Sequence, residues 1–94
     1  MNDKKDKEER NIIISINGKE TNSIPLQDVI KRKRSVKDLV MKEIDKSPEI
    51  KAVAEFFVYI NGKKIKPKDV KNVRIDNVGT IEIFDKVPED YIER

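Results

Sequence analysis

Serine hydroxyls are the first groups in this sequence that could act as catalytic nucleophiles. They occur at Ser15, Ser23, Ser35 and Ser47. A serine becomes nucleophilic beside a base, and histidine, the usual base, is absent from the 94 residues. Ser35 and Ser47 each precede an expected helical segment, where serine commonly caps the first turn. We therefore interpret these two serines as helix caps.

Adjacent carboxylates at Glu89 and Asp90 are the other groups that could move protons. They lie in a polar stretch where nothing is expected to raise a carboxyl pKa or exclude water. The chain also lacks cysteine, so neither thiolate nor imidazole is available to bind zinc and no disulfide can form. We expect a protein with no catalytic activity, no cofactor and no structural metal.

Basic side chains gather in two stretches. The first is Lys31, Arg32, Lys33 and Arg34, and the second holds Lys63, Lys64, Lys66, Lys68, Lys71 and Arg74. The chain has 21 basic and 18 acidic residues, and this net charge of +3 does not by itself indicate a nucleic-acid partner. If the first stretch lay beside Lys68, Lys71 and Arg74, that face could bind RNA with a strong salt dependence. The plainer interpretation is that these charges keep a small domain soluble.

One domain is expected between two polar ends. Residues 1–10 have nothing apolar after Met1, which predicts a disordered charged leader. Residues 11–85 carry the apolar segments and predict the domain, and residues 86–94 predict a polar tail. No run approaches the roughly 18 apolar residues of a membrane-spanning helix, so we expect a cytoplasmic protein with no membrane partner.

The domain begins with a predicted hairpin that spans about residues 11–27. Residues 11–16 are rich in isoleucine, which is typical of a strand. Asn17-Gly18 predicts a type I′ turn, because both of its central residues need positive φ. The returning strand is expected at residues 21–26, with Pro25 at its end because proline cannot donate a hydrogen bond to the sheet.

A helix is predicted next, at residues 36–46. Ser35 and Asp38 have the spacing of a capping box, and Val36, Leu39, Val40 and Ile44 follow as one apolar stripe. Pro48 is expected to begin a further helical turn, with Ile50, Val53 and Ala54 on one side.

A second strand and turn are predicted at residues 55–62, with apolar side chains on both faces of the strand. Phe56, Val58 and Ile60 share one face, and Phe57 and Tyr59 share the other. Asn61-Gly62 again predicts a tight turn, followed by a short strand at residues 63–66. Residues 80–84 alternate in polarity and predict the last strand.

The order of these elements predicts an α+β domain with one main helix packed on one face of a mixed sheet of four or five strands. A hairpin, a helix and then three short strands is also the order of the β-grasp, or ubiquitin-like, fold. The segment 35–84 resembles the ubiquitin-like sulfur carriers of thiamine and molybdopterin synthesis, the ThiS/MoaD family. The resemblance rests on Val36 and Leu39 in the helix, Pro48 to Ile50 after it, and the strand that ends in Asn61-Gly62.

Members of that family accept sulfur at a flexible C-terminal Gly-Gly tail, which the resemblance would place at the end of this chain. The sequence ends in Asp90-Tyr-Ile-Glu-Arg94, and no glycine follows Gly79. Bulky side chains would restrict the extended backbone that such a tail adopts. Sulfur carriage or conjugation to other proteins is therefore disfavoured, and no active-site residue of the family is carried over.

The leading expectation is a non-catalytic module or adaptor that binds another protein. We expect its docking surface on the strand face that bears Phe57 and Tyr59, flanked by Lys63, Lys64 and Lys66, because an apolar patch of this kind must be covered by its own chain or by a partner. RNA binding by the basic face is the alternative. We expect a monomer or a weak homodimer.

Overall fold

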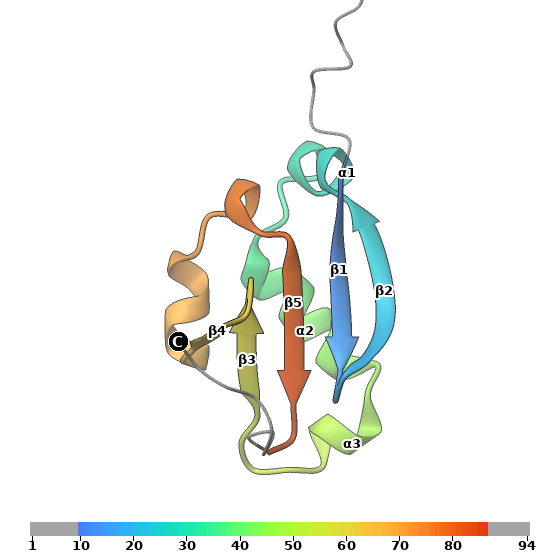
Figure 1. Ribbon diagram of the computed structural model, residues 1–94, viewed down its shortest axis with the longest axis vertical. Helices are drawn as coiled ribbons and strands as arrows, with labels where there is room; N and C mark the ends of the chain where they lie inside the picture. Colours follow the sequence, from blue (N-terminus) through green and yellow to red (C-terminus); the bar gives the residue numbers. More distant parts are fainter. Residues whose placement is uncertain (1–9, 87–94) are drawn as a thin grey trace, which may run out of the picture.

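A five-stranded mixed sheet forms one layer of the protein, with the strand order β2-β1-β5-β3-β4. The computed structural model describes residues 10–86. Strands β1 (Asn11–Ile16) and β5 (Thr80–Phe84) run parallel at the centre, and the other neighbouring pairs are antiparallel. The main helix α2 (Val36–Asp45) lies behind the strands in Figure 1 and covers one face of the sheet. The predicted α+β class and mixed sheet are confirmed.

Both hairpins turn at the predicted Asn-Gly pairs. Strand β2 (Lys19–Pro25) follows β1, and strands β3 (Phe57–Ile60) and β4 (Lys63–Ile65) form the second hairpin. The φ angles are 51° at Asn17 and 85° at Gly18, and 55° at Asn61 and 83° at Gly62. These positive values are those of a type I′ turn, whose twist matches that of the strands it joins.

Helix α2 starts with the predicted capping box and ends one residue earlier than expected. The Ser35 hydroxyl accepts from the Asp38 amide at 3.2 Å, and the Asp38 carboxylate accepts from the Ser35 amide at 3.0 Å. The prediction that the Ser47 side chain caps the next helix is wrong, because it makes no capping hydrogen bond to helix α3 (Pro48–Lys51). Its hydroxyl instead donates to the carbonyl of Glu43 at 3.0 Å, which satisfies a free carbonyl near the end of α2.

Three short helical segments were not predicted from the sequence. Helix α1 (Leu26–Lys31) follows β2 directly, and the 3₁₀ helices η2 (Pro67–Asn72) and η3 (Ile75–Asn77) lie between β4 and β5. Their buried side chains are few, with Leu26 and Val29 in α1 and Val70 in η2. Segments this short carry too few apolar residues to display a helical period.

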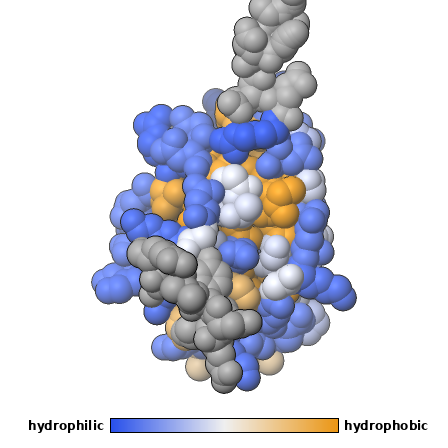
Figure 2. Space-filling model, in the orientation of Figure 1, coloured by the Kyte–Doolittle hydropathy of each residue, from blue (hydrophilic) through white to orange (hydrophobic). Residues whose placement is uncertain are grey.

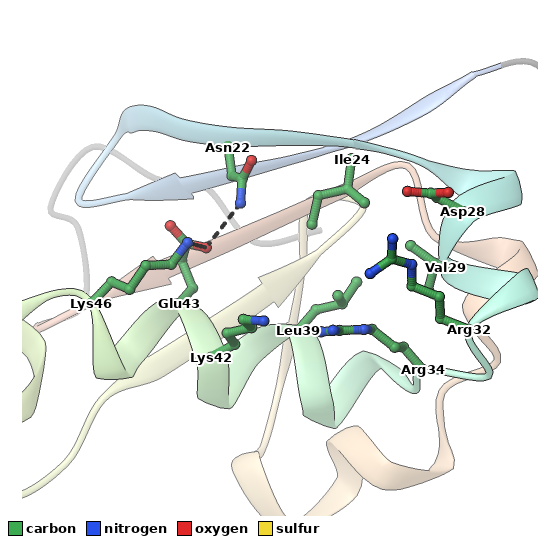
Figure 3. A pocket seen from close by; sticks show the side chains of 10 residues that line it. All are labelled: Asn22, Ile24, Asp28, Val29, Arg32, Arg34, Leu39, Lys42, Glu43 and Lys46. Atoms are coloured by element: carbon green, nitrogen blue, oxygen red, sulfur yellow. Dashed lines mark hydrogen bonds and ion pairs between the residues drawn. The ribbon is translucent and has the colours of Figure 1, made fainter.

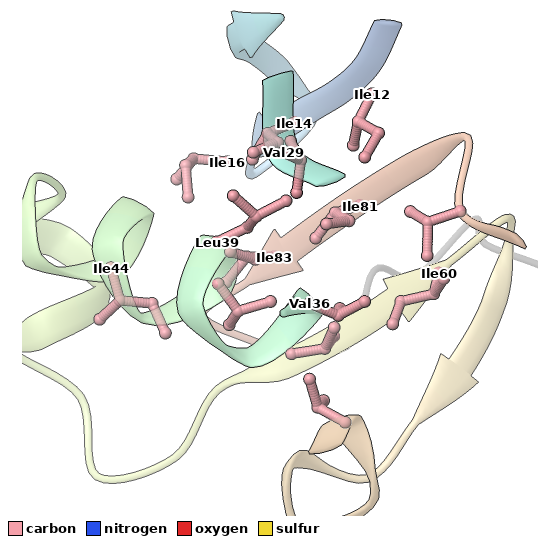
Figure 4. Packing of buried hydrophobic residues seen from close by; sticks show 14 of the residues in the cluster. Ile12, Ile14, Ile16, Val29, Val36, Leu39, Ile44, Ile60, Ile81 and Ile83 are labelled. Atoms are coloured by element: carbon pink, nitrogen blue, oxygen red, sulfur yellow. The ribbon is translucent and has the colours of Figure 1, made fainter. Parts of the chain in front are cut away.

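The core lies between the inner face of the sheet and α2. Alternate residues of β1, namely Ile12, Ile14 and Ile16, are 0%, 0% and 3% exposed, and the apolar stripe of α2 packs against them (Figure 4). The short helix α3 contributes Ile50, at 1% exposure. Val53 was predicted to share that buried side but is 36% exposed, because α3 ends at Lys51 and the chain turns away.

The asparagines of the two hairpin turns hold opposite ends of β5. The Asn61 side chain accepts from the amides of Gly79 and Thr80, at 2.7 and 3.2 Å, and donates to the carbonyl of Asn77 at 2.8 Å. The Asn17 side chain accepts from the Asp85 amide at 3.0 Å and donates to its carboxylate at 3.3 Å. Each turn therefore fixes one end of the central strand as well as its own hairpin.

The predicted leader and tail lie outside the described residues, except for Arg10 and Lys86 at the limits of the domain. Arg10 was assigned to the disordered leader, but its guanidinium donates to the carbonyls of Val78 and Asp76. Its carbonyl also accepts from the amide of Leu26 at 3.0 Å. Arg10 therefore belongs to the folded domain.

Candidate docking surfaces

A hollow with a volume of ≈ 340 Å³ opens beside the second hairpin, where β3 begins and β4 ends. Its lining residues are Ala54, Glu55, Phe56, Phe57, Lys64, Ile65, Lys66 and Pro67. We call this the hairpin hollow. Its volume is at the lower end of the range for binding sites and suits one or two side chains of a partner.

The hairpin hollow combines an apolar lining with two lysines. Phe56 and Ile65 pack against the core, while Phe57 is partly exposed. The Lys64 ammonium lies 5.7 Å from the centre of the Phe57 ring, within the range of a cation–π contact. The site can therefore receive an apolar side chain, with Lys64 and Lys66 available to acidic groups on the same partner.

Three of the five residues predicted for the docking face meet in this hollow, namely Phe57, Lys64 and Lys66. Lys63 is exposed but lies at the turn end of β4, outside the hollow. The prediction that Tyr59 forms part of an exposed docking face is wrong, because Tyr59 is only 2% exposed.

Tyr59 lies among side chains of the two neighbouring strands. It lies in β3 between Lys64 of β4 and Glu82 of β5, and its ring meets that of Phe84 edge to face at 5.5 Å. Figure 2 shows the face opposite the helices, with apolar side chains near its middle and hydrophilic ones along its sides. Tyr59 therefore offers almost no exposed surface on this face.

A second concave site, with a volume of ≈ 210 Å³, lies between β2 and the helices α1 and α2 (Figure 3). It is lined by Asn22, Ile24, Asp28, Val29, Arg32, Arg34, Leu39, Lys42, Glu43 and Lys46. We call it the β2–α2 groove. It lies at the β2 edge of the sheet, whereas the hairpin hollow lies at the β4 edge.

A buried carboxylate forms one wall of the β2–α2 groove. Glu43 is 4% exposed, and its carboxylate accepts hydrogen bonds from the Thr21 hydroxyl at 2.8 Å and from the side-chain amide of Asn22 at 3.5 Å. The Lys46 ammonium lies 3.9 Å from the same carboxylate. These partners compensate the burial of the charge and tie α2 to the edge strand.

Only two of the four residues of the first basic stretch line the β2–α2 groove. Arg32 and Arg34 line it, while Lys31 closes α1 and Lys33 has a φ of 56° in the connection to α2. Neither Lys31 nor Lys33 lines the groove.

The residues expected to complete an RNA-binding face do not line the β2–α2 groove. Lys68 and Lys71 lie on η2, which packs against α2, and they line neither concave site. Arg74 is paired with Asp76 at 3.1 Å, and this hydrogen bond raises the pKa of Arg74 and lowers that of Asp76. Of the seven residues predicted for this face, Arg32 and Arg34 share the β2–α2 groove, and RNA binding by the wider basic face stays a prediction.

Sequence reasoning missed the groove residues on α2, although one signal pointed to them. Glu43 follows Leu39 by four residues and Val40 by three, which places a carboxylate on the apolar side of the helix. Lys42 and Lys46 are four residues apart and flank it. A charged residue on the buried apolar stripe of a helix indicates that polar partners lie on the strand that faces it.

Within residues 10–86, no group of three or more acidic, cysteine or histidine side chains is placed to hold a metal ion. Helices long and apolar enough to cross a bilayer are likewise absent from that part of the chain. Comparison of the chain with protein-family models, curated proteins and solved structures gives no match.

Proposed function

We propose that this chain is a non-catalytic β-grasp, ubiquitin-like module that binds another protein. The strand order β2-β1-β5-β3-β4, with β1 and β5 parallel and α2 between the two hairpins, supports the β-grasp assignment. A fold alone does not define a function, so the binding role rests on the surface.

The hairpin hollow is the observation that supports protein binding. Phe56, Phe57 and Ile65 present apolar surface at an open concave site, with Lys64 and Lys66 beside it. Buried apolar contact supplies affinity at an interface, and flanking charges select the partner and its orientation. The partner's contact segment is therefore one apolar side chain followed or preceded by carboxylates.

The test is a crosslinking experiment in lysate of the native cells. A photoreactive phenylalanine analogue replaces Phe57, and crosslinked products are compared for the otherwise unchanged chain and for Lys64→Glu/Lys66→Glu. The proposal predicts one dominant protein adduct that the charge reversals reduce by about tenfold, since each reversal replaces an attraction with a repulsion.

Lys68→Glu/Lys71→Glu is the matched control, because it makes the same change of charge in the adjoining segment but outside the hollow. This control is expected to leave the adduct unchanged. If the control reduces the adduct as much as the hollow variant, net charge and not the hollow governs binding. An adduct that disappears after nuclease treatment would replace the proposal with RNA binding.

A further inference from the structure

We propose that the β2–α2 groove is a second docking site, which binds a short extended segment of another protein containing an apolar residue between acidic ones. The groove uses none of the residues of the hairpin hollow and lies at the other edge of the sheet. This site would make the chain a two-sided adaptor.

The middle of the groove is apolar. Val29 and Leu39 are 0% and 2% exposed, and Ile24 is partly buried beside them. In Figure 3 these three side chains come from α1, α2 and β2 and point toward the same gap. One aliphatic side chain of a partner can lie against them and remove apolar surface from water on both molecules.

Cationic side chains flank this apolar middle on both sides. Figure 3 shows Arg32 and Arg34 at the α1 end, with Lys42 and Lys46 toward the end of α2. Within the described residues, neither arginine makes an ion pair with a carboxylate, and the same holds for Lys42.

The two acidic groups of the groove do not cancel these charges. Glu43 is already engaged by Thr21, Asn22 and Lys46. With Lys46 paired to Glu43, Asp28 is the single exposed carboxylate beside the three remaining cations of the lining, which are Arg32, Arg34 and Lys42. The field in the groove therefore favours an anionic occupant.

The dimensions of the groove set the length of the occupant. Helix α2 has ten residues, which corresponds to about 15 Å at a rise of 1.5 Å per residue. An extended chain advances about 3.3 Å per residue, so about five residues span that distance. A volume of ≈ 210 Å³ admits one large side chain, which fits a single apolar residue with acidic neighbours on both sides.

The outer edge of β2 is closed to a partner strand. The Ile13 amide donates to the carbonyl of Gly79 and therefore points toward β5, away from β2. Ile13 and its partner Ser23 in β2 are thus a pair without hydrogen bonds between them, so the backbone amide and carbonyl of Ser23 face the outer edge of the sheet. The Ser23 amide is already bonded to the Asn22 side chain at 2.9 Å.

Two further features protect the same edge. The register shifts beside Thr21, which leaves that residue in a bulge, and Pro25 has no amide hydrogen to donate. Such devices prevent sheet extension. The occupant is therefore held by side-chain contacts. Reversing a charge in the groove is expected to weaken its binding strongly.

The test uses a fluorescein-labelled peptide of sequence Glu-Asp-Leu-Asp-Glu with blocked ends, titrated with the full chain and followed by fluorescence anisotropy. Two control peptides are Gln-Asn-Leu-Asn-Gln, which lacks the charge, and Glu-Asp-Ala-Asp-Glu, which lacks the large apolar side chain. Both controls are expected to bind about tenfold more weakly than the acidic leucine peptide.

Protein variants locate the site. Lys42→Glu is expected to weaken binding of the acidic leucine peptide about tenfold, whereas Lys37→Glu, on the same helix but outside the groove, should change it less than about twofold. Both lysines are exposed, and unchanged urea unfolding of the variants establishes that the fold is retained.

Several results would overturn the proposal. They are no detectable peptide binding, equal binding of the amide peptide, or equal losses for Lys42→Glu and Lys37→Glu. Displacement of the peptide by oligouridylate at lower concentration than by unlabelled peptide would assign the groove to RNA. A loss with Lys64→Glu/Lys66→Glu alone would assign the peptide to the hairpin hollow, so the two proposals fail separately.

Discussion

Replacement of Asn61 by glycine tests whether the turn of the second hairpin stabilises the central strand. Glycine adopts the φ of 55° without strain, so the hairpin turn itself is preserved. The substitution removes the three hydrogen bonds from the Asn61 side chain to Gly79, Thr80 and Asn77. Any loss of stability then reports the attachment of β5.

The expected loss follows from the number of bonds. Each contributes about 0.5–1.5 kcal/mol net, and these groups are exposed, so three bonds correspond to about 1.5–3 kcal/mol. Asn17→Gly removes two bonds, one of them long at 3.3 Å, and is expected to cost about 1 kcal/mol less. The two changes share the same turn type and the same gain of chain entropy in the unfolded state, so these effects cancel in the difference.

The assay is urea unfolding followed by far-ultraviolet circular dichroism, with linear extrapolation of the free energy of unfolding. Asn61→Ala adds a useful third variant, because alanine at positive φ costs a further 1–2 kcal/mol or so. If Asn61→Gly and Asn17→Gly lower the free energy of unfolding equally, or if Asn61→Gly has no measurable effect, the side-chain bonds to β5 do not stabilise the protein.

Three further changes have defined outcomes. The pKa of Asp38 is held below its ordinary 3.8, mainly by the hydrogen bond from the Ser35 amide, so the carboxylate stabilises the fold at neutral pH and loses this effect as pH falls below 3.8. The urea midpoints of wild type and Asp38→Asn should differ at pH 7, and the difference should shrink as pH is lowered below 3.8. Glu43→Ala removes the charged acceptor of the Thr21 hydroxyl and the Asn22 side-chain amide and should cost about 1–3 kcal/mol in urea, with Glu43→Gln closer to wild type; equal midpoints would refute this role. Val70→Ala should cost a similar amount by opening a cavity under η2, and an unchanged thermal midpoint would show that η2 is dispensable.

The sequence was sufficient to predict most of the sheet because its signals are local. Asn17-Gly18 and Asn61-Gly62 each fix a turn by backbone conformation, and the runs beside them are long enough to show their buried faces. Ser35 and Asp38 likewise fix the start of α2 within one helical turn. Structural features that depend only on a few consecutive residues can therefore be predicted from one sequence.

The candidate sites were harder to predict because they depend on contacts between distant segments. Tyr59 was expected to be exposed because its face alternates outward in β3, but it is 2% exposed, with Glu82 beside it on β5 and the Phe84 ring against its own. Arg34 joins the groove only because α1, absent from the prediction, turns the chain back against α2. Neither contact has a signature in the spacing of residues along the chain.

The central position of β5 has a consequence for how the protein is made. This strand is the last one in the described chain, yet it is the only link between the β1–β2 and β3–β4 hairpins in the sheet. During synthesis both hairpins emerge from the ribosome before β5, and isolated hairpins are marginally stable in water. The sheet can therefore assemble only after residue 84 has emerged, and a nascent chain stalled before β5 exposes the strand edges of β1 and β3 to chaperones and to other chains.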